Sequence, residues 1–572
     1  MQLLDDLNDG QRLAASAGDG PVLIVAGPGT GKTKTLTTRA AFLLEQGVSA
    51  SEIVALTFTK KAANEMRERL AKLLGAGRRL PNITTFHALG HDLLKQHGNG
   101  TTLLDEARRM EIIRSLAKPV ALKRATPREL SLIISRAKTS LTSMADEPTT
   151  QLLQRYEAAL TDQSLHDFDD LLIKAFALLK GSKGARYQHV LVDEFQDTSE
   201  LQYEMLKLLS THQNIFAIGD PNQSIYAFRG AGAEMFDRFK ADFPEVTAVN
   251  LTINYRSRPE IITLANKIFL DAPQLTTHQH EPGKVAVIQT LNEYSEAAYV
   301  LETIEDGIGG SDFQTAHAGA TPRQPRDYAV LYRTHRAAKV LQKAFAEHGI
   351  PYQIAGEGSP YERPEIQAII ALMRHLYTNG EVPTVKGFTQ TQIKKLLADV
   401  SSDQTVHDLA AQLTVTFGFT IDQDLRQFLG MLVQFGSDVT AALQHVDDIS
   451  EGEFYDPTVN AVTLMTIHAS KGLEFEHIFL IGAEEGILPK LNAKGEGNIA
   501  EEQRLFYVAA TRAKQNLEIL HTKKRAGEQP SLSRFVEMLS SDILPRTVDP
   551  NMQALEKRLR KHQQKRAQTS LF

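Results

Sequence analysis

The sequence contains no cysteine and no tryptophan among its 572 residues. Without cysteine the chain cannot form disulfides, use a thiol nucleophile, ligate an iron–sulfur cluster or build a cysteine-based zinc site. No uninterrupted apolar run approaches the ~18 residues that a membrane-spanning helix needs. The first residues, MQLLDDLNDGQ, are acidic and do not have the pattern of a signal peptide. These absences predict a cytoplasmic protein.

The chain also lacks an excess of positive charge, since 63 basic and 69 acidic side chains give a net charge of −6. Any surface that binds a polyanion must therefore be local. Residues 101–140 carry nine Lys or Arg against four acids, whereas residues 366–458 have a net charge of −7. The basic stretch is the better candidate for binding phosphates, although a solvated helix face is nearly as good an explanation.

Strand-length apolar runs alternate with segments of helical period in two series, separated by a break near residues 250–280. The runs begin at Pro21, Ile53, His189 and Asn214 in the first series and at Tyr328, Ala461, His477 and Asn516 in the second. Buried parallel strands with crossover helices have this pattern. We therefore predict an α/β protein with two lobes.

Strand-like runs are missing from two stretches, which predicts a mainly helical insertion in each lobe. The predicted first lobe consists of residues 1–88 and 166–250, with an insertion at 89–165. The predicted second lobe consists of residues 251–365 and 459–545, with a short acidic insertion at 366–458 and a basic tail at 546–572.

The segment AGPGTGKT follows an apolar run and precedes a helical pattern, which is the setting of a phosphate-binding loop. The predicted nucleotide contacts are Ala26, Gly27, Pro28, Gly29, Thr30, Gly31, Lys32 and Thr33. In such a loop Lys32 reaches the β- and γ-phosphates, and the Thr33 hydroxyl holds Mg²⁺. The strict pattern has Gly where Ala26 stands, and we expect a small side chain to suffice there.

A second apolar run ends in the adjacent carboxylates of VDEFQD. Asp193 is predicted to bind Mg²⁺, and Glu194 to orient and activate the attacking water. Paired with the phosphate loop, these carboxylates predict a hydrolytic ATP site. Arg256 and Arg512 are candidates for cations at the γ-phosphate, although each taken alone is better explained as a solvated surface charge.

Nine blocks, in order, resemble the motifs of UvrD/Rep/PcrA-type superfamily 1 DNA helicases. They are LNDGQ, AGPGTGKT, TFTKKAANEM, TFH, VDEFQDT, GDPNQSIYAFRG, NYRS, MTIHASKGLEF and YVAATRA. The resemblance spans residues 7 to about 535. It implies two RecA-like P-loop lobes with parallel sheets, ATP in the cleft between them, and single-stranded DNA crossing both.

The resemblance also implies roles for single residues. On the nucleotide side, Gln11 would read the adenine, Tyr255 would stack on it, and Glu474 would contact the ribose. Gln223 would sense the γ-phosphate, and Arg256 and Arg512 would contact that phosphate from the opposite lobe. On the DNA side, Phe58, Tyr226 and Phe228 would stack on bases, with Lys60, His87, Arg229 and His468 near the strand. The family usually has tryptophan where Phe228 stands, so stacking there is expected to be weaker.

We therefore predict an ATP-dependent 3′–5′ DNA helicase or translocase that acts in DNA repair or replication restart. Two alternatives stay open. One is an ATP-driven remodeller that displaces proteins from single-stranded DNA without processive unwinding, and the other is an RNA-directed motor. The acidic insertion has Gly387-Phe-Thr389 roughly where relatives carry a Gly-Ile-Gly duplex contact. It therefore suggests a regulatory or protein-contact role rather than a duplex clamp.

The C-terminal residues form a separate motif. The sequence ends in QTSLF, which resembles the short peptide by which bacterial replication and repair proteins dock on the sliding clamp. Gln568 would fill a polar pocket, and Leu571 with Phe572 an apolar one. The sliding clamp is therefore a second predicted partner.

Overall fold

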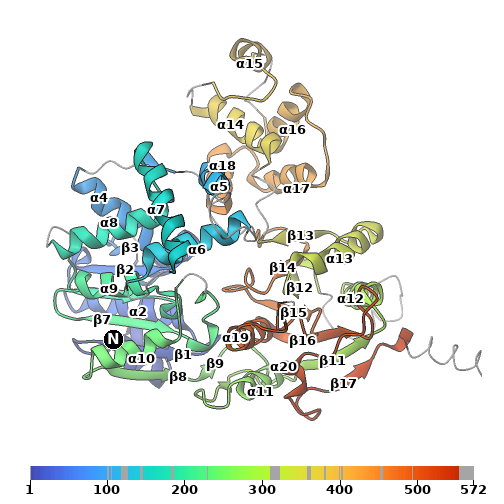
Figure 1. Cartoon of the computed structure of the whole chain (residues 1–572), viewed down its shortest axis with the longest axis horizontal. Helices are drawn as coiled ribbons and strands as arrows, with labels where there is room; N and C mark the ends of the chain where they lie inside the picture. The colour runs from blue at the N-terminus through green and yellow to red at the C-terminus, as the bar shows by residue number, and fades with distance from the viewer. Residues whose placement is uncertain are drawn as a thin grey trace, which may run out of the picture. The chain divides into compact units, whose positions relative to one another are not determined.

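The computed structural model describes residues 2–75, 77–98, 102–104, 106–116, 126–141, 146–181, 186–227, 230–309, 323–356, 363–378, 382–398, 400, 404–450, 455–492 and 494–552. The chain divides into two compact units (Figure 1). Unit 1 is Met1–Pro282 with Asn498–Thr511, and unit 2 is Gly283–Gly497 with Arg512–Phe572. Within the described ranges, none of the helices has the combination of length and apolarity that crossing a bilayer requires.

Unit 1 is built on a six-stranded parallel sheet with the order β3-β2-β6-β7-β1-β8. Its strands are β1 (Val22–Ala26), β2 (Ile53–Thr57), β3 (Asn82–Thr85), β6 (His189–Val192), β7 (Ile215–Gly219) and β8 (Thr247–Leu251). The helices of this part are α1 (Asp9–Ala15), α2 (Lys32–Glu45), α3 (Lys60–Leu74), α4 (Phe86–Gln96), α8 (Phe168–Lys180), α9 (Glu200–Leu209) and α10 (Glu234–Asp242). The prediction of an α/β lobe with a parallel sheet is confirmed.

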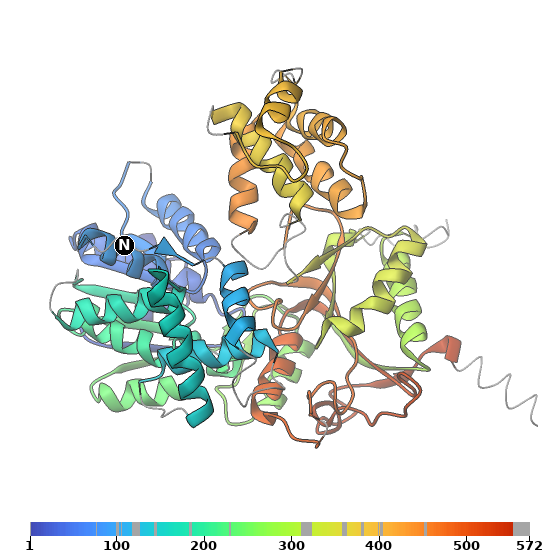
Figure 2. The ribbon, with the colours of Figure 1, turned by 45° about the horizontal axis from the view of Figure 1, so that its top comes forward.

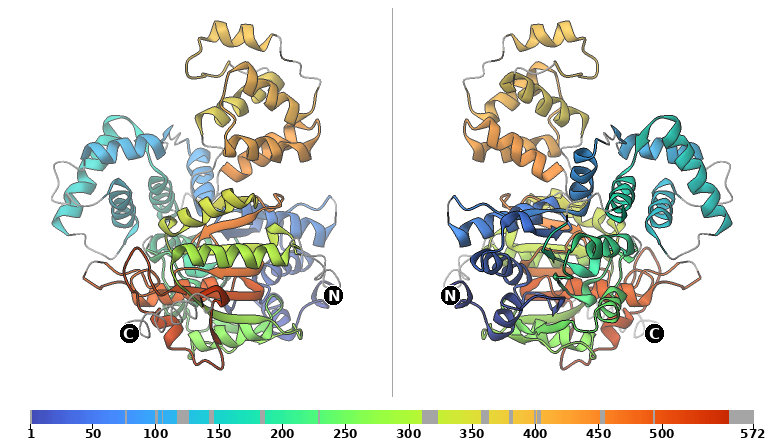
Figure 3. Two further views of the ribbon diagram at one scale, coloured as in Figure 1. Left: turned by 90° about the vertical axis from the view of Figure 1, so that its right-hand side faces the viewer. Right: turned by 90° about the vertical axis from the view of Figure 1, so that its left-hand side faces the viewer.

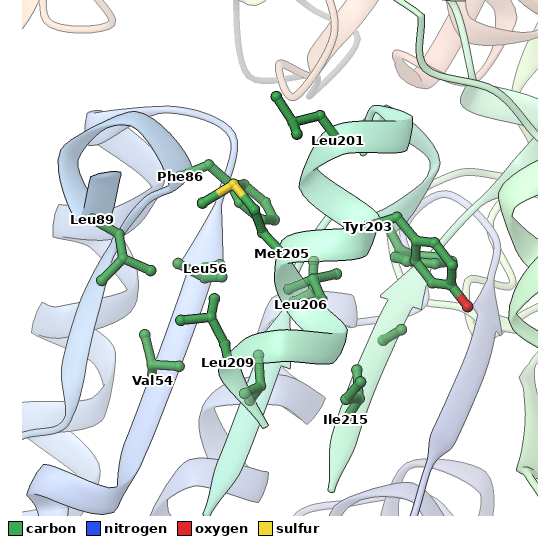
Figure 4. Close-up of a cluster of buried hydrophobic side chains, with 14 of the residues drawn as sticks. Val54, Leu56, Phe86, Leu89, Leu201, Tyr203, Met205, Leu206, Leu209 and Ile215 are labelled. Carbon is green, nitrogen blue, oxygen red and sulfur yellow. The ribbon is translucent and has the colours of Figure 1, made fainter. Parts of the chain in front are cut away.

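Both faces of this sheet are covered by helices, because its central strands alternate between two hydrophobic clusters. In β2, Val54 and Leu56 belong to the cluster under α4, α8, α9 and α10, whereas Ile53 and Ala55 belong to the cluster under α1, α2 and α3. Figure 4 shows the first cluster, with Leu206 and Leu209 of α9 above Val54. Burial on both faces explains why the strand runs are apolar at every position.

The insertion in unit 1 is mainly helical, as predicted. It contains α5 (Glu106–Leu116), α6 (Pro127–Thr139) and α7 (Glu147–Asp162), with a two-stranded sheet of β4 (Thr102–Leu103) and β5 (Leu165–His166). These helices enclose a small core of their own that includes Ile113, Ile134 and Leu152. The insertion therefore has its own apolar core.

Part of the basic charge of residues 101–140 lies inside the insertion rather than on its surface. The ammonium group of Lys138, whose side chain is only 3% exposed, lies 2.7 Å from Glu157, 3.0 Å from Asp167 and 2.7 Å from Asp170. Burial alone would lower the pKa of Lys138, but these carboxylates raise it above its ordinary value. Lys138 therefore serves the internal structure and is not a phosphate contact.

Replacing Lys138 with methionine should strongly destabilise unit 1. The variant leaves buried carboxylates without their cation, and breaking such a pair from one side costs about 3–5 kcal/mol. Urea denaturation should show a markedly lower midpoint for Lys138→Met, whereas Lys180→Met, at an exposed lysine of α8, should stay within about 0.5 kcal/mol of the wild type. Equal midpoints for the two variants would contradict the assignment.

The remaining elements of unit 1 come from two segments that the sequence predicts in the second lobe. Residues 251–282 supply β9 (Ile253–Asn254), α11 (Pro259–Ile268) and β10 (Thr276–Thr277), and Asn498–Thr511 supplies α19 (Ile499–Ala510). Helix α19 packs on α11, and the Gln503 amide donates to the carbonyl of Ile268 at 2.8 Å. By their packing these two segments therefore belong to unit 1, and the lobe boundary at residue 250 stays a prediction.

Unit 2 is built on a seven-stranded parallel sheet with the order β13-β14-β12-β15-β16-β11-β17. Its strands are β11 (Lys284–Thr290), β12 (Tyr328–Tyr332), β13 (Tyr352–Ala355), β14 (Val462–Thr466), β15 (Phe475–Leu480), β16 (Ala513–Thr522) and β17 (Arg546–Val548). Helices α12 (Glu293–Gly307) and α13 (His335–His348) lie across the strands (Figure 3) and share a core with them. A short helix, α20 (Arg534–Glu537), precedes β17.

The insertion of unit 2 is also helical, as predicted. Its helices, drawn in yellow to orange in Figure 2, are α14 (Pro364–Thr378), α15 (Gln390–Leu397), α16 (Val406–Thr416), α17 (Gln423–Leu432) and α18 (Val439–Ser450). They enclose a separate hydrophobic core, against which Phe388 packs with its ring edge-on to Phe417 at 5.1 Å. Phe388, the aromatic residue of the Gly-Phe-Thr segment, therefore contributes to the internal packing of this insertion.

A buried ion triad joins three elements of unit 2. The guanidinium of Arg525 lies 2.7 Å from Glu296 of α12 and 2.7 Å from Glu484, which follows β15. Burial, together with the charge of Glu484, raises the pKa of Glu296 to about 7, although Arg525 opposes the rise. Glu296 therefore takes up a proton more readily in the folded unit than in the unfolded chain.

The stability of unit 2 should depend on pH through Glu296. A folded pKa above the unfolded value of 4.5 gives stabilisation that is complete below pH 4.5 and is lost as the pH rises through about 7. We therefore expect the unfolding free energy of the wild type, measured relative to Glu296→Gln by urea denaturation, to fall across this range. The unfolding free energy of the wild type relative to Asp306→Asn, at an exposed position on α12, should not change with pH. A flat difference for Glu296→Gln would refute the prediction.

Candidate functional site

The loop between β1 and α2 is shaped by glycines that neighbouring side chains approach closely. Gly29 and Gly31 have φ angles of +66° and +83°, in the left-handed region that favours glycine. A Cβ atom on Gly29 would lie 2.6 Å from the Asn254 amide nitrogen, and one on Gly31 would lie 2.6 Å from that of Gln11. The loop therefore needs glycine at both positions.

Ala26, where the strict pattern has glycine, is the last residue of β1 and is fully buried in the core. Its methyl group belongs to the hydrophobic cluster on that face of the sheet. A small apolar side chain therefore fits at this position.

Helix α2 begins directly after the loop, and its N-cap, Gly31, has no side chain to cap the first amides. A helix N-terminus with exposed amides is a natural anion site. The ammonium group of Lys32 lies back over the loop, where it donates to the carbonyls of Ala26 at 3.3 Å and Gly27 at 3.4 Å. The loop thus presents a cation and helix amides at the same place.

The two predicted carboxylates lie at the carboxyl end of β6, next to this loop. Asp193 is buried, and the side chain of Thr33 lies close enough to lower its pKa. Burial, and then the charge of Glu194, raise the pKa of Asp193 to about 7, while Lys32 opposes the rise. Lys32, Thr33, Asp193 and Glu194 therefore form one electrostatically coupled site within unit 1.

Glu194 has an unusual backbone conformation for a residue with a side chain. Its φ angle of +50° lies in the left-handed region, which costs of order 1–3 kcal/mol and is typically found at functional sites. Its carboxylate accepts a hydrogen bond from the Gln196 amide. The backbone and Gln196 together set the direction of the Glu194 side chain.

Gln11 and Tyr255, the predicted adenine contacts, are brought together by Asn8. The Gln11 side chain donates to the carbonyl of Thr30 at 2.8 Å and accepts from the Asn8 backbone amide at 3.2 Å. The Asn8 side chain donates to the Tyr255 hydroxyl at 2.8 Å, and the Tyr255 backbone amide donates to the Gly29 carbonyl at 2.9 Å. Tyr255 is 37% exposed, so its ring is accessible for stacking.

His278 also contacts the Tyr255 side chain, and no sequence motif singled out this histidine. The centroids of its ring and the Tyr255 ring are 5.2 Å apart. The His278 amide donates to the carbonyl of Asn254 at 2.8 Å, so β10 supports the segment that carries Tyr255.

Gln223 and Arg256 also lie in unit 1. The Gln223 side chain is buried and donates to the Asp220 carboxylate at 2.7 Å. The Arg256 guanidinium donates to the carbonyl of Thr511 at 3.4 Å, and its backbone amide donates to the Asn254 side chain at 2.8 Å. Arg256 therefore packs in the same unit as the phosphate loop, and its expected origin in the second lobe stays a prediction.

Arg512 and Glu474 belong to unit 2. Arg512 is the first residue after Thr511, is buried, and donates to the carbonyl of Leu473 at 3.3 Å. Glu474 pairs with Lys514 at 3.3 Å. Their roles at the γ-phosphate and the ribose stay predictions.

Aromatic side chains of the predicted DNA contacts pair with each other in unit 1. Phe58 stacks on Tyr226 with centroids 5.3 Å apart and an angle of 13° between the rings, and Phe58 is 37% exposed. His87 meets Phe168 edge-on at 6.1 Å, and Phe168 is 54% exposed. Phe168 is an exposed aromatic side chain that sequence motifs did not single out.

The other predicted DNA contacts come from different parts of the chain. Lys60 is exposed at the first turn of α3, and His468 is half-buried after β14 of unit 2. Phe228 and Arg229 lie outside the described residues, as do Gln568, Leu571 and Phe572 of the tail.

Comparison with known proteins identifies relatives over nearly the whole chain. The family model of the UvrD/REP helicase N-terminal domain matches residues 7–244, and that of the UvrD-like helicase C-terminal domain matches residues 249–417 and 422–524. The chain is 29% identical to the ATP-dependent DNA helicase PcrA of Bacillus subtilis, over 95% of this chain and 87% of the relative. It is 29% identical to the ATP-dependent DNA helicase Rep of Escherichia coli, over 97% of each chain.

The two parallel-sheet units fit the two RecA-like lobes that the resemblance implied. Since the two helicase domain models follow one another along the chain and together cover most of it, the chain belongs to the UvrD/Rep/PcrA family of helicases.

Proposed function

We propose that this protein is an ATP-dependent DNA helicase that moves 3′ to 5′ along single-stranded DNA, in DNA repair or replication restart. The observation that carries the proposal is the coupled site of unit 1, in which Lys32, Thr33 and the Asp193–Glu194 pair meet at the phosphate loop. The names of the relatives, each an ATP-dependent DNA helicase, support the same activity.

The residues of the site fit Mg²⁺. The Thr33 hydroxyl lies close enough to the Asp193 carboxylate to lower its pKa, and oxygen donors are the ligands that Mg²⁺ prefers. The raised pKa of Asp193 reflects a buried negative charge that a divalent cation would stabilise. Bound there, Mg²⁺ would neutralise charge on the phosphates of ATP.

Each side chain of the site has its own role in hydrolysis. Lys32 places its ammonium charge at the γ-phosphate, and the amides at the start of α2 face the phosphates. Glu194 takes a proton from the water that attacks phosphorus, while the bond from phosphorus to the ADP oxygen breaks. Gln11 and Tyr255 hold the base, and Gln223 and Arg256 lie at the γ-phosphate end.

The DNA side of the proposal rests on the exposed aromatic side chains. Base stacking on aromatic side chains is tolerant of sequence and contributes about 1–3 kcal/mol per base. Phe58 and Phe168 present exposed rings next to Tyr226 and His87 in unit 1. Docking of the tail on the sliding clamp is a further part of the proposal that rests on the sequence alone.

The test is ATP hydrolysis measured with and without single-stranded DNA, and with a matched RNA oligonucleotide. We expect strong stimulation by DNA and weak stimulation by RNA. Stimulation by RNA alone would identify an RNA-directed motor, and hydrolysis that no strand stimulates would contradict the proposal.

A further inference from the structure

The side chain of Gln196 lies between the ends of two neighbouring strands. Gln196 follows β6, is fully buried, and uses both ends of its amide. Its nitrogen donates to the Glu194 carboxylate, and its oxygen accepts from the backbone amide of Asp220, after β7, at 2.9 Å. The carbonyl of Gln196 accepts from the Ser224 hydroxyl at 3.3 Å. One residue thus connects the Glu194 carboxylate to the loop that follows β7.

Gly219 makes room for this connection. A Cβ atom on Gly219 would lie 2.3 Å from the Gln196 side-chain oxygen and 2.9 Å from the Phe195 backbone nitrogen. No side chain fits in that space. The pairing of Gln196 with Gly219 therefore explains why β7 ends in glycine.

Asp220 continues the connection to Gln223. Its carboxylate accepts from the Gln223 side chain at 2.7 Å and from the Asn222 amide at 3.0 Å. Burial raises the pKa of Asp220, while the charge of Lys32 opposes the rise and that of Glu194 adds to it. Asp220 is therefore close enough to interact with both Lys32 and Glu194.

We propose that Gln196 and Asp220 are positioning residues for ATP hydrolysis, an inference that rests on the proposed function. Gln196 fixes the carboxylate of Glu194, and Asp220 fixes the side chain of Gln223. One chain of hydrogen bonds thereby holds both Glu194, the base that takes the proton, and the side-chain amide of Gln223 at the γ-phosphate. A base displaced by about 1 Å can lose about 10²-fold in rate, so the bridge should affect kcat more than nucleotide binding.

The first test is steady-state hydrolysis by Gln196→Ala and Gln196→Glu with saturating single-stranded DNA. Both variants lose the donor to Glu194, and we expect kcat to fall about 10- to 100-fold while KM for ATP changes less than about threefold. Gln196→Glu keeps the shape of the side chain, so it reports on the lost hydrogen bond if the alanine variant is unstable. The matched control is Gln202→Ala, a buried glutamine that caps α9, which should keep its kcat.

The second test asks whether Gln196 acts through Glu194. In a Glu194→Gln background, replacing Gln196 with Ala should lower kcat no further, because the group that it positions is already gone. A merely structural role would lower kcat in both backgrounds. Wild-type kcat in both Gln196 variants, or additive effects in the double variant, would overturn the inference while leaving the proposed function intact. A wild-type enzyme that DNA does not stimulate would defeat the proposed function itself.

Discussion

Replacing Lys32 with alanine should lower the kcat of single-strand-stimulated ATP hydrolysis by about 10³-fold, the upper range for removing one preorganised group at a developing negative charge. The ammonium group of Lys32 lies over the loop carbonyls, next to the amides at the start of α2 that would face the phosphates. The measurement is steady-state phosphate release at saturating DNA.

The matched control for Lys32 is Lys34, two residues further along the chain. Lys34 is on the same helix, is exposed, and donates to the carbonyl of Asp6 at 2.7 Å. Lys34→Ala should hydrolyse ATP within about twofold of the wild-type rate, since surface changes of this kind are nearly neutral. If Lys32→Ala kept more than about a tenth of the wild-type rate, the phosphate-loop assignment would be wrong, because a lysine at the γ-phosphate contributes far more than tenfold.

Replacing Glu194 with glutamine should lower kcat by about 10²–10⁴-fold, the usual contribution of a positioned general base. The carboxamide keeps the shape of the side chain but cannot accept the proton from water. ATP binding should persist, because the loop and the start of α2 are unchanged. The prediction is therefore a large loss in kcat with a nearly constant KM, in contrast to a general loss of folding.

A carboxylate outside the site serves as the control for Glu194. Glu204, on α9, pairs with Lys207 at 2.9 Å and with Arg238 at 2.6 Å. Glu204→Gln removes one negative charge from the same unit and should leave kcat close to that of the wild type. Equal losses in both variants would indicate damage to the fold instead of loss of the base.

The strands that the sequence predicted are mostly central strands, and those that it missed are mostly edges. Strands β1, β2, β6 and β7 of unit 1 appear in the sequence as apolar runs because neighbours cover them on both sides. The strands β3, β8, β13 and β17 form the edges of the two large sheets, and exposed or half-buried residues interrupt their apolar pattern. Among the described strands, only β11 was missed from the interior of these two sheets.

The motifs predicted which residue types form the nucleotide site, but not how they are held. Lys32, Thr33, Asp193 and Glu194 lie together as their strand and helix contexts indicated. Asn8, Gln196 and His278 were not assigned roles, because their contacts join segments that are far apart in the sequence or depend on one rotamer. The position of Arg256 in unit 1 likewise depends on the packing of α11 and α19.

The most direct test of the helicase proposal is strand displacement from a duplex that carries a single-stranded tail on one side only. We expect the wild type with ATP to separate a duplex with a 3′ tail and not one with a 5′ tail, and Lys32→Ala to separate neither. Hydrolysis stimulated by single strands, without displacement of either duplex, would contradict the helicase proposal and would favour a remodeller that strips proteins from DNA.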